Sequence, residues 1–168
     1  NFILVFNGEI YNHKLLRKEL ELTGYVFDTD SDTEVLIKMY DCYGDSFVDK
    51  LRGMYSFVIY DKEKQNLTLA RDFFGIKPLY LYLKEKEVFF SSEMIALIDL
   101  LKQNKINFEI SVSAQKEYLE RDFIKDNNII VDAFELEKGK VFKYENNMLT
   151  EVRDIVYSEP TDNVKLID

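Results

Sequence analysis

The chain has 168 residues, 46% hydrophobic and 32% charged, a balance typical of one soluble globular domain. Its net charge of −9 argues against nucleic-acid binding, which needs clustered Lys and Arg. No apolar run approaches the ~20 residues that span a bilayer, and no signal peptide is recognisable, so we expect no membrane association. One cysteine, Cys42, excludes an intrachain disulfide and favours a cytoplasmic protein. The first residue is Asn1, so the sequence is either processed or part of a longer product.

The first 44 residues predict two strands and two amphipathic helices. A turn is expected at Asn7-Gly8, and Asn12 is expected to cap the first helix. Ser31 and Glu34 have the spacing of a capping box, and Gly44 should end the second helix. The expected elements are a strand at 2–6, a helix at 13–22, a short strand at 25–29 and a helix starting after residue 31.

From Met54 onward the hydrophobic period changes to two, which is typical of strands. Residues 79–83 alternate Leu and Tyr, and residues 55–60 are apolar on both faces, so we expect the latter strand to be covered on both sides. Residues 93–102 are apolar nearly all round, as in a buried helix. The expected elements are strands at 55–60, 67–71, 79–83 and 88–90, helices at 93–102 and around 114–123, and a hairpin of 141–144 with 148–152.

This order predicts an α+β fold, with antiparallel strands joined by hairpins and stacked as a layered sandwich. We expect one domain over residues 1–155. The polar residues 156–168, which include Pro160, are expected to form a linker.

The segment Asn7 to Asn12 is the most informative one. In a neutral interpretation Asn7-Gly8 is only a tight turn, because both residue types accept positive φ. In a functional interpretation the Asn7 amide and the Gly8 N–H are two donors aimed at one point, as an oxyanion hole requires. Glycine would also let the backbone come close to a substrate.

The surrounding residues resemble the glutaminase domain of asparagine synthetases, and the resemblance covers about residues 2–155. One late element departs from the pattern, because the Pro of the family's Leu-x-Pro-Gly turn is absent from Leu136 to Gly139. The matching stretches, in order, are Asn7 to Asn12, Ser31 to Val35, Leu51 to Met54, Ala70 to Asp72, Phe74 to Tyr80, and Ser91 to Glu93 followed by Ala96-Leu97.

The resemblance implies a class II glutamine amidotransferase with the N-terminal nucleophile hydrolase fold, a four-layer αββα sandwich. In this family the thiol of an N-terminal Cys attacks glutamine, and its own α-amine acts as the base. Glutamate and ammonia are the products. The ammonia travels through a tunnel to a synthetase domain, where ATP and Mg²⁺ are expected; the domain described by this sequence is expected to need no cofactor.

The resemblance also assigns roles to five residues. Asn7 and Gly8 would form the oxyanion hole, and Glu9 and Asp32 would face the α-amino end of glutamine. Asp32 is alternatively an acid at a helix N-terminus that only balances the helix dipole. Met54 is a candidate for the entrance of the tunnel, with packing in the core as the alternative.

Other matching residues are expected to be structural, namely Arg71, Asp72, Lys77 and Glu93. Cys42 is expected to be a buried inert thiol, because it has no free α-amine. His13, the single histidine, is expected to be solvated, and no cluster has the spacing of metal ligands.

The resemblance places the nucleophilic Cys, and an Arg for the glutamine carboxylate, several dozen residues before Asn7. We therefore expect this chain to lack the N-terminal segment of the fold and to be inactive alone. Its expected partners are glutamine and a C-terminal synthetase domain, with a homodimer left open. Two alternatives remain: a scaffold domain without hydrolysis, as in β-lactam synthetases, and a sugar- or nucleotide-directed amidotransferase. The acceptor of the ammonia cannot be deduced from these residues.

Overall fold

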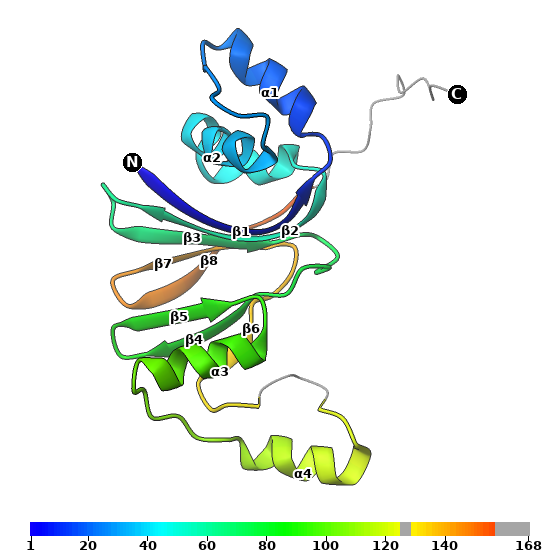
Figure 1. Ribbon diagram of the computed structural model, residues 1–168, viewed down its shortest axis with the longest axis vertical. Helices are drawn as coiled ribbons and strands as arrows, with labels where there is room; N and C mark the ends of the chain where they lie inside the picture. Colours follow the sequence, from blue (N-terminus) through cyan, green and yellow to red (C-terminus); the bar gives the residue numbers. More distant parts are fainter. Residues whose placement is uncertain (125–128, 157–168) are drawn as a thin grey trace.

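The computed structural model describes residues 1–124 and 129–156. Two antiparallel sheets stack face to face, and helices cover the outer face of each (Figure 1). This is the expected αββα sandwich. The first sheet has the strand order β1-β2-β3-β7-β8 and the second β5-β4-β6. The elements are β1 (Phe2–Ile10), α1 (His13–Leu22), α2 (Asp32–Tyr43), η1 (Gly44–Lys50), β2 (Gly53–Asp61), β3 (Asn66–Arg71), β4 (Tyr80–Lys84), β5 (Glu87–Ser91), α3 (Met94–Gln103), α4 (Val112–Arg121), β6 (Ala133–Glu135), β7 (Lys140–Glu145) and β8 (Met148–Asp154).

In the five-stranded sheet β1 is an edge strand, and β2 pairs antiparallel with β1 on one side and with the central strand β3 on the other. The turn expected at Asn7-Gly8 is wrong, because β1 continues through both residues to Ile10. Gly8 does have a positive φ, +148°, but it adopts this conformation within the β1–β2 strand pair and not in a turn. Since Asn7 pairs with Ser56 and Gly8 with Tyr55, the motif is held in the sheet.

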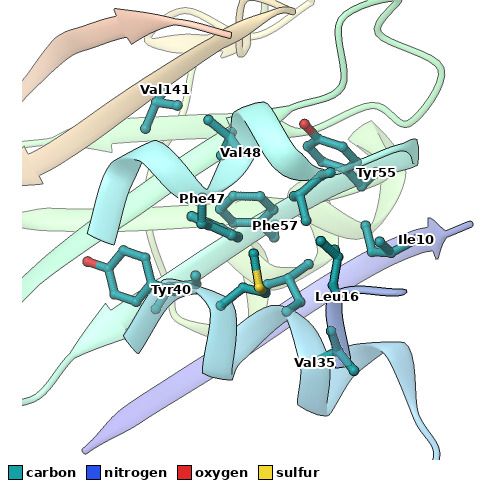
Figure 2. Packing of buried hydrophobic residues seen from close by; sticks show 14 of the residues in the cluster. Ile10, Leu16, Val35, Tyr40, Phe47, Val48, Tyr55, Phe57 and Val141 are labelled. Atoms are coloured by element: carbon teal, nitrogen blue, oxygen red, sulfur yellow. The ribbon is translucent and has the colours of Figure 1, made fainter. Parts of the chain in front are cut away.

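The largest core lies between the five-stranded sheet and the first helical layer. Side chains from α1, α2 and η1 pack on alternate residues of β1 and β2, as the close-up in Figure 2 shows. Tyr40, Phe47 and Phe57 form a chain of ring contacts with centroids 5.5–5.7 Å apart. The odd-numbered residues of β2 enter this core, whereas Val58 faces the second sheet. The strand is therefore covered on both sides, as its sequence predicts.

The second sheet lies between two smaller cores. Leu and Tyr alternate along residues 79–83, so each residue type enters the core on its own face of the sheet. Leu79 and Leu81 pack between the sheets, whereas Tyr82 packs under α3 with Leu97 and Leu101. Burial of α3 is less complete than its composition predicts, because Ile95 remains 73% exposed. The helix covers the sheet with one face only.

Three local features differ from what the sequence predicts. Residues 25–29 form no strand; instead Phe27 packs against the first core, with the cationic groups of Arg17 and Lys38 within 4.6 Å of its ring centroid. Strand β6 was missed because it is only three residues long. The capping box is half formed: the Ser31 hydroxyl accepts the Thr33 N–H, but the carboxylate of Glu34 accepts the N–H groups of residues 28 and 29.

The expected linker falls almost wholly outside the described residues, which end at Val156.

Candidate active site at the carboxyl end of β1

Gly8 allows an unusually close approach between β1 and β2. Its φ is +148°, and a Cβ at this position would lie 2.1 Å from the Met54 carbonyl oxygen. The same holds on the other strand, where a Cβ on Gly53 would lie 2.1 Å from the Glu9 carbonyl oxygen. Both positions therefore require glycine, and the backbone of the motif is fixed tightly against its neighbour.

Asn7 lies at a cavity of about 230 Å³ between the two sheets. Its half-buried side chain makes no hydrogen bond to any described residue, so the amide is available to a ligand. The other lining residues are mostly apolar. The lining consists of Val5, Phe6, Asn7, Ser56, Phe57, Val58, Leu79, Phe90, Ser91 and Ser92.

Glu9 and Met54 are direct partners across the β1–β2 pair, two residues further along than Asn7 and Ser56. Because side chains of paired residues share a face and alternate with a period of two, all four are expected on the face toward the second sheet. The exposed carboxylate of Glu9 forms no ion pair with any described residue. Glu9 is thus free to meet a cationic group of a ligand.

Asp32 reaches the end of β1 from the helical layer. One of its carboxylate oxygens, Oδ2, accepts the Ile10 N–H at 3.0 Å. Asp32 is not among the residues that line the cavity at Asn7, so no single cavity joins the two side chains. Ile10 is three residues from Asn7, about 10 Å along the strand, which keeps both groups at one end of the sheet. Their joint use by one ligand stays a prediction.

Two residues that hold the motif in place do so through contacts other than those expected from the sequence. The Asn12 side chain makes no helix cap; it donates to the Lys50 carbonyl at 2.8 Å and accepts the Arg52 N–H at 2.9 Å. The Nδ1 of His13 lies 2.8 Å from the Ile10 carbonyl oxygen, so it donates there and the ring is not merely solvated. These residues brace the segment after Glu9 against β2. No signal in the sequence near Asn12 or His13 indicates these contacts.

The model of the glutamine amidotransferase domain family matches residues 1–155. The chain belongs to this family. Asparagine synthetase [glutamine-hydrolyzing] 1 of Bacillus subtilis is 46% identical over 123 residues, 73% of this chain and 19% of the relative. Asparagine synthetase B [glutamine-hydrolyzing] of Escherichia coli is 34% identical over 161 residues, 89% of this chain and 28% of the relative. The amidotransferase domain therefore spans less than a third of these relatives.

Solved structures share the fold of this amidotransferase domain. The glutamine phosphoribosylpyrophosphate amidotransferase of B. subtilis, solved with ADP and GMP, superposes with a TM-score of 0.62 at 22% identity, covering 90% of this chain and 29% of that one. A regulatory enzyme of purine biosynthesis gives 0.61 at 22% identity, with 90% and 28% covered. At this identity the likeness concerns the fold alone.

In this amidotransferase domain Arg71 and Asp72 are structural, as their sequence context predicts. The fully buried carboxylate of Asp72 accepts four backbone N–H groups, from Tyr55 and from three residues of the loop that follows β3. The Arg71 guanidinium donates to the carbonyls of Gly75, Lys77 and Leu136 and pairs with Glu135 at 2.8 Å. The pair fixes the loop over residues 73–78.

Cys42 lies on α2 against the first core and lines no part of the cavity at Asn7. Within residues 1–124 and 129–156, no three His, Cys, Asp or Glu side chains are grouped to hold a metal ion. The same part of the chain contains no helix with the length and apolarity needed to cross a membrane.

Proposed function

We propose that this domain hydrolyses the side-chain amide of glutamine to glutamate and ammonia. The proposal includes the use of the ammonia for asparagine synthesis by an ATP- and Mg²⁺-dependent domain of the same polypeptide. The observation that carries it is the free Asn7 amide beside Gly8 at an open cavity, in a member of the glutamine amidotransferase family. The relatives support the product, since their names specify glutamine-hydrolysing asparagine synthetases. The single cysteine of the sequence supports a cytoplasmic site of action.

The donors at Asn7 and Gly8 fit the charge that develops in amide hydrolysis. When the thiolate adds to the amide carbon, its proton having passed to the α-amine of the same Cys, the carbonyl oxygen becomes an oxyanion. The C–N bond then breaks as the α-ammonium returns that proton to the leaving nitrogen, so ammonia leaves and a thioester remains, which water hydrolyses to glutamate. Two donors fixed beforehand stabilise that oxyanion without reorganising during the reaction. The close β1–β2 approach at Gly8 provides the fixed backbone, and the sheet pairing of Asn7 provides the fixed side chain. The nucleophile would be the N-terminal Cys thiolate that the family resemblance implies.

The carboxylates of Glu9 and Asp32 suit the other end of glutamine, which carries an α-ammonium group. The Asp32 carboxylate accepts the Ile10 N–H through Oδ2 at 3.0 Å and the Thr33 hydroxyl through Oδ1 at 3.5 Å, and each oxygen keeps a further lone pair for a ligand. Its place in the first turn of α2 puts the carboxylate at the positive end of the helix dipole. One ligand bound along the end of β1 would thus have its amide at Asn7 and its ammonium toward the acids.

Kinetics of single variants in the full-length protein test this assignment. We expect Asn7→Ala to lower kcat for glutamine hydrolysis by ~10²–10³, the usual effect of losing one oxyanion donor. We expect Asp32→Asn to raise KM for glutamine and to change kcat much less. Asn107→Ala is a matched control, because Asn107 is an exposed amide remote from β1. An unchanged kcat for Asn7→Ala would remove Asn7 from the oxyanion hole, and an unchanged KM for Asp32→Asn would leave that residue a purely structural role.

A further inference from the structure

Helix α4 packs against the rest of the described chain through little of its surface. Only Ala114 of its ten residues is buried, whereas Val112 and Leu119 are 79% and 83% exposed. A helix shorter than about 12–15 residues is marginal in water unless tertiary packing of an apolar face stabilises it. A further packing partner would therefore stabilise α4.

The exposed apolar residues of α4 lie on one face. Val112 and Leu119 are seven residues apart, a spacing that puts both on the same side of a helix, and we call these two residues the α4 stripe. Ile110 before the helix and Phe123 after it are also exposed, so the apolar surface extends past both helix ends. A grouped set of exposed large apolar residues marks an interaction site more often than scattered single ones do.

Backbone hydrogen bonds anchor the segment that carries α4. The Ser111 N–H donates to the Ile129 carbonyl at 2.9 Å, and the Val131 N–H donates to the Glu109 carbonyl at 2.9 Å. Between these bonds, Ile130 is buried in the core under α3. Because the segment is held at its base, less entropy is lost when a partner packs against α4.

The charges beside the α4 stripe all lie on one flank. At 3.6 residues per turn, Lys116 and Glu120 lie about 40° and about 80° round the helix from Val112, on the same side of the stripe. They form an intrahelical pair at 3.9 Å, and both side chains are more than half exposed. The other flank carries Gln115 and Tyr118, which are uncharged.

An antiparallel second copy of α4 would complete this charge pattern. A two-fold axis that lies in the interface, perpendicular to the helices, sets the charged flanks of the two copies side by side. With the axis between residues 117 and 118, Lys116 of each copy faces Glu120 of the other, about 1.5 Å apart along the helix direction. The two Leu119 residues then lie ~4.5 Å apart along that direction, next to the axis. A parallel pair would instead set each charged flank against an uncharged one.

The end of the described chain favours a second copy over a following domain as the partner of α4. The Val156 N–H donates to the carboxylate of Asp49 in η1 at 3.0 Å. Figure 1 shows η1 and α4 on opposite outer faces of the sandwich. A segment that continues past Val156 therefore starts at the layer far from α4.

We propose that α4 is a homodimer interface, in which two copies of this chain pack antiparallel through the α4 stripe. The apolar contact supplies the affinity, and the pairs between Lys116 and Glu120 of different copies set the orientation and select the partner. The proposal is independent of the proposed function, because none of the candidate active-site residues takes part in it.

Charge reversal in the full-length protein tests this pairing by sedimentation velocity over a range of concentrations. Lys116→Glu and Glu120→Lys each set like charges against each other in a homodimer, but a 1:1 mixture of the two variants restores opposite charges in a heterodimer. We expect each variant alone to have a dimer Kd about tenfold higher than the parent protein, and the mixture to recover the parent value. Reversing the comparable exposed pair on α3, with Lys102→Glu and Asp99→Lys, should leave the Kd unchanged.

Substitutions at Leu119 test the apolar contact, after circular dichroism has confirmed the fold of each variant. We expect Leu119→Asp to yield monomers. Leu119→Cys should be cross-linked between copies by a short bis-maleimide, whereas Ile95→Cys at an exposed position on α3 should not. A dimer that survives Leu119→Asp, or a mixture of charge variants that does not recover dimerisation, would overturn the proposal.

A parent protein that is monomeric at every concentration would overturn it as well. In that monomer, protection of the Leu119→Cys thiol from a simple maleimide would assign the α4 stripe to another domain of the same polypeptide. Rapid labelling would show that nothing covers the stripe.

Discussion

Gly8→Ala tests whether the close approach of β1 to β2 requires glycine at position 8. The new Cβ would lie 2.1 Å from the Met54 carbonyl oxygen, so the two strands would have to separate. Forcing a methyl group into a packed region costs ~1–3 kcal/mol. A non-glycine residue at φ +148° adds backbone strain of roughly 1–2 kcal/mol. We expect a total loss of about 2–5 kcal/mol in the free energy of unfolding.

Gly44→Ala is the control that isolates the steric part. Gly44 also has a positive φ, +55°, but nothing lies within 4 Å of a Cβ placed there. Urea denaturation of both variants should show Gly8→Ala to be the less stable by ~1–3 kcal/mol. For a chain of this length the difference amounts to roughly 2–4 °C in Tm per kcal/mol. Equal losses in the two variants would refute the argument that the strand approach, rather than φ alone, requires glycine.

Three further predictions concern residues that support the site. Hydrogen bonds from Lys38, Thr29 and the Asp28 N–H lower the pKa of Glu34 to about 2, from an ordinary value near 4.5. Ionised Glu34 therefore stabilises the folded state fully above pH 4.5, and this stabilisation is lost as the pH falls toward 2. We expect Glu34→Gln to be less stable than the parent at pH 7 and equal to it near pH 2. Thermal melts across that pH range measure the difference. Asn12→Ala removes two hydrogen bonds to backbone and should cost ~1–3 kcal/mol in urea denaturation, against no loss for Asn107→Ala. Asp72→Asn replaces a buried carboxylate with a group that can accept only through one oxygen, and we expect a loss of ~3–5 kcal/mol; a loss under 1 kcal/mol would show that the four N–H groups find other partners.

The sequence predicts the layers of this fold well because each layer has its own hydrophobic period. Alternation of Leu and Tyr along residues 79–83 places one set between the sheets and the other under α3, as found. The helical pattern of residues 32–43 likewise predicts the face that enters the first core. These hydrophobic patterns are local, because each one depends only on which face of its own strand or helix packs against a neighbouring layer.

The candidate site was predicted less fully, because its geometry depends on contacts between distant segments. Nothing near Asn12 indicates that its side chain binds the backbone of residues 50–52. The Asn-Gly pair predicts a turn on local preference alone, and only the presence of β2 shows that Gly8 serves a close approach inside a sheet. The position of Asp32 at a helix start was predicted correctly, but its bond to Ile10 was not.

The stacking of the two sheets has a consequence for the order in which the domain opens. Strands within each sheet are joined by ladders of backbone hydrogen bonds, whereas the sheets meet through side chains of the second core. Arg71, rooted in β3, reaches across that boundary to the Leu136 carbonyl. Opening along the boundary would break few hydrogen bonds, so the amides of β4 to β6 should exchange with solvent through an event of lower free energy than global unfolding. The two sheets, which enclose the cavity at Asn7 between them, would then separate from each other before either sheet unfolds.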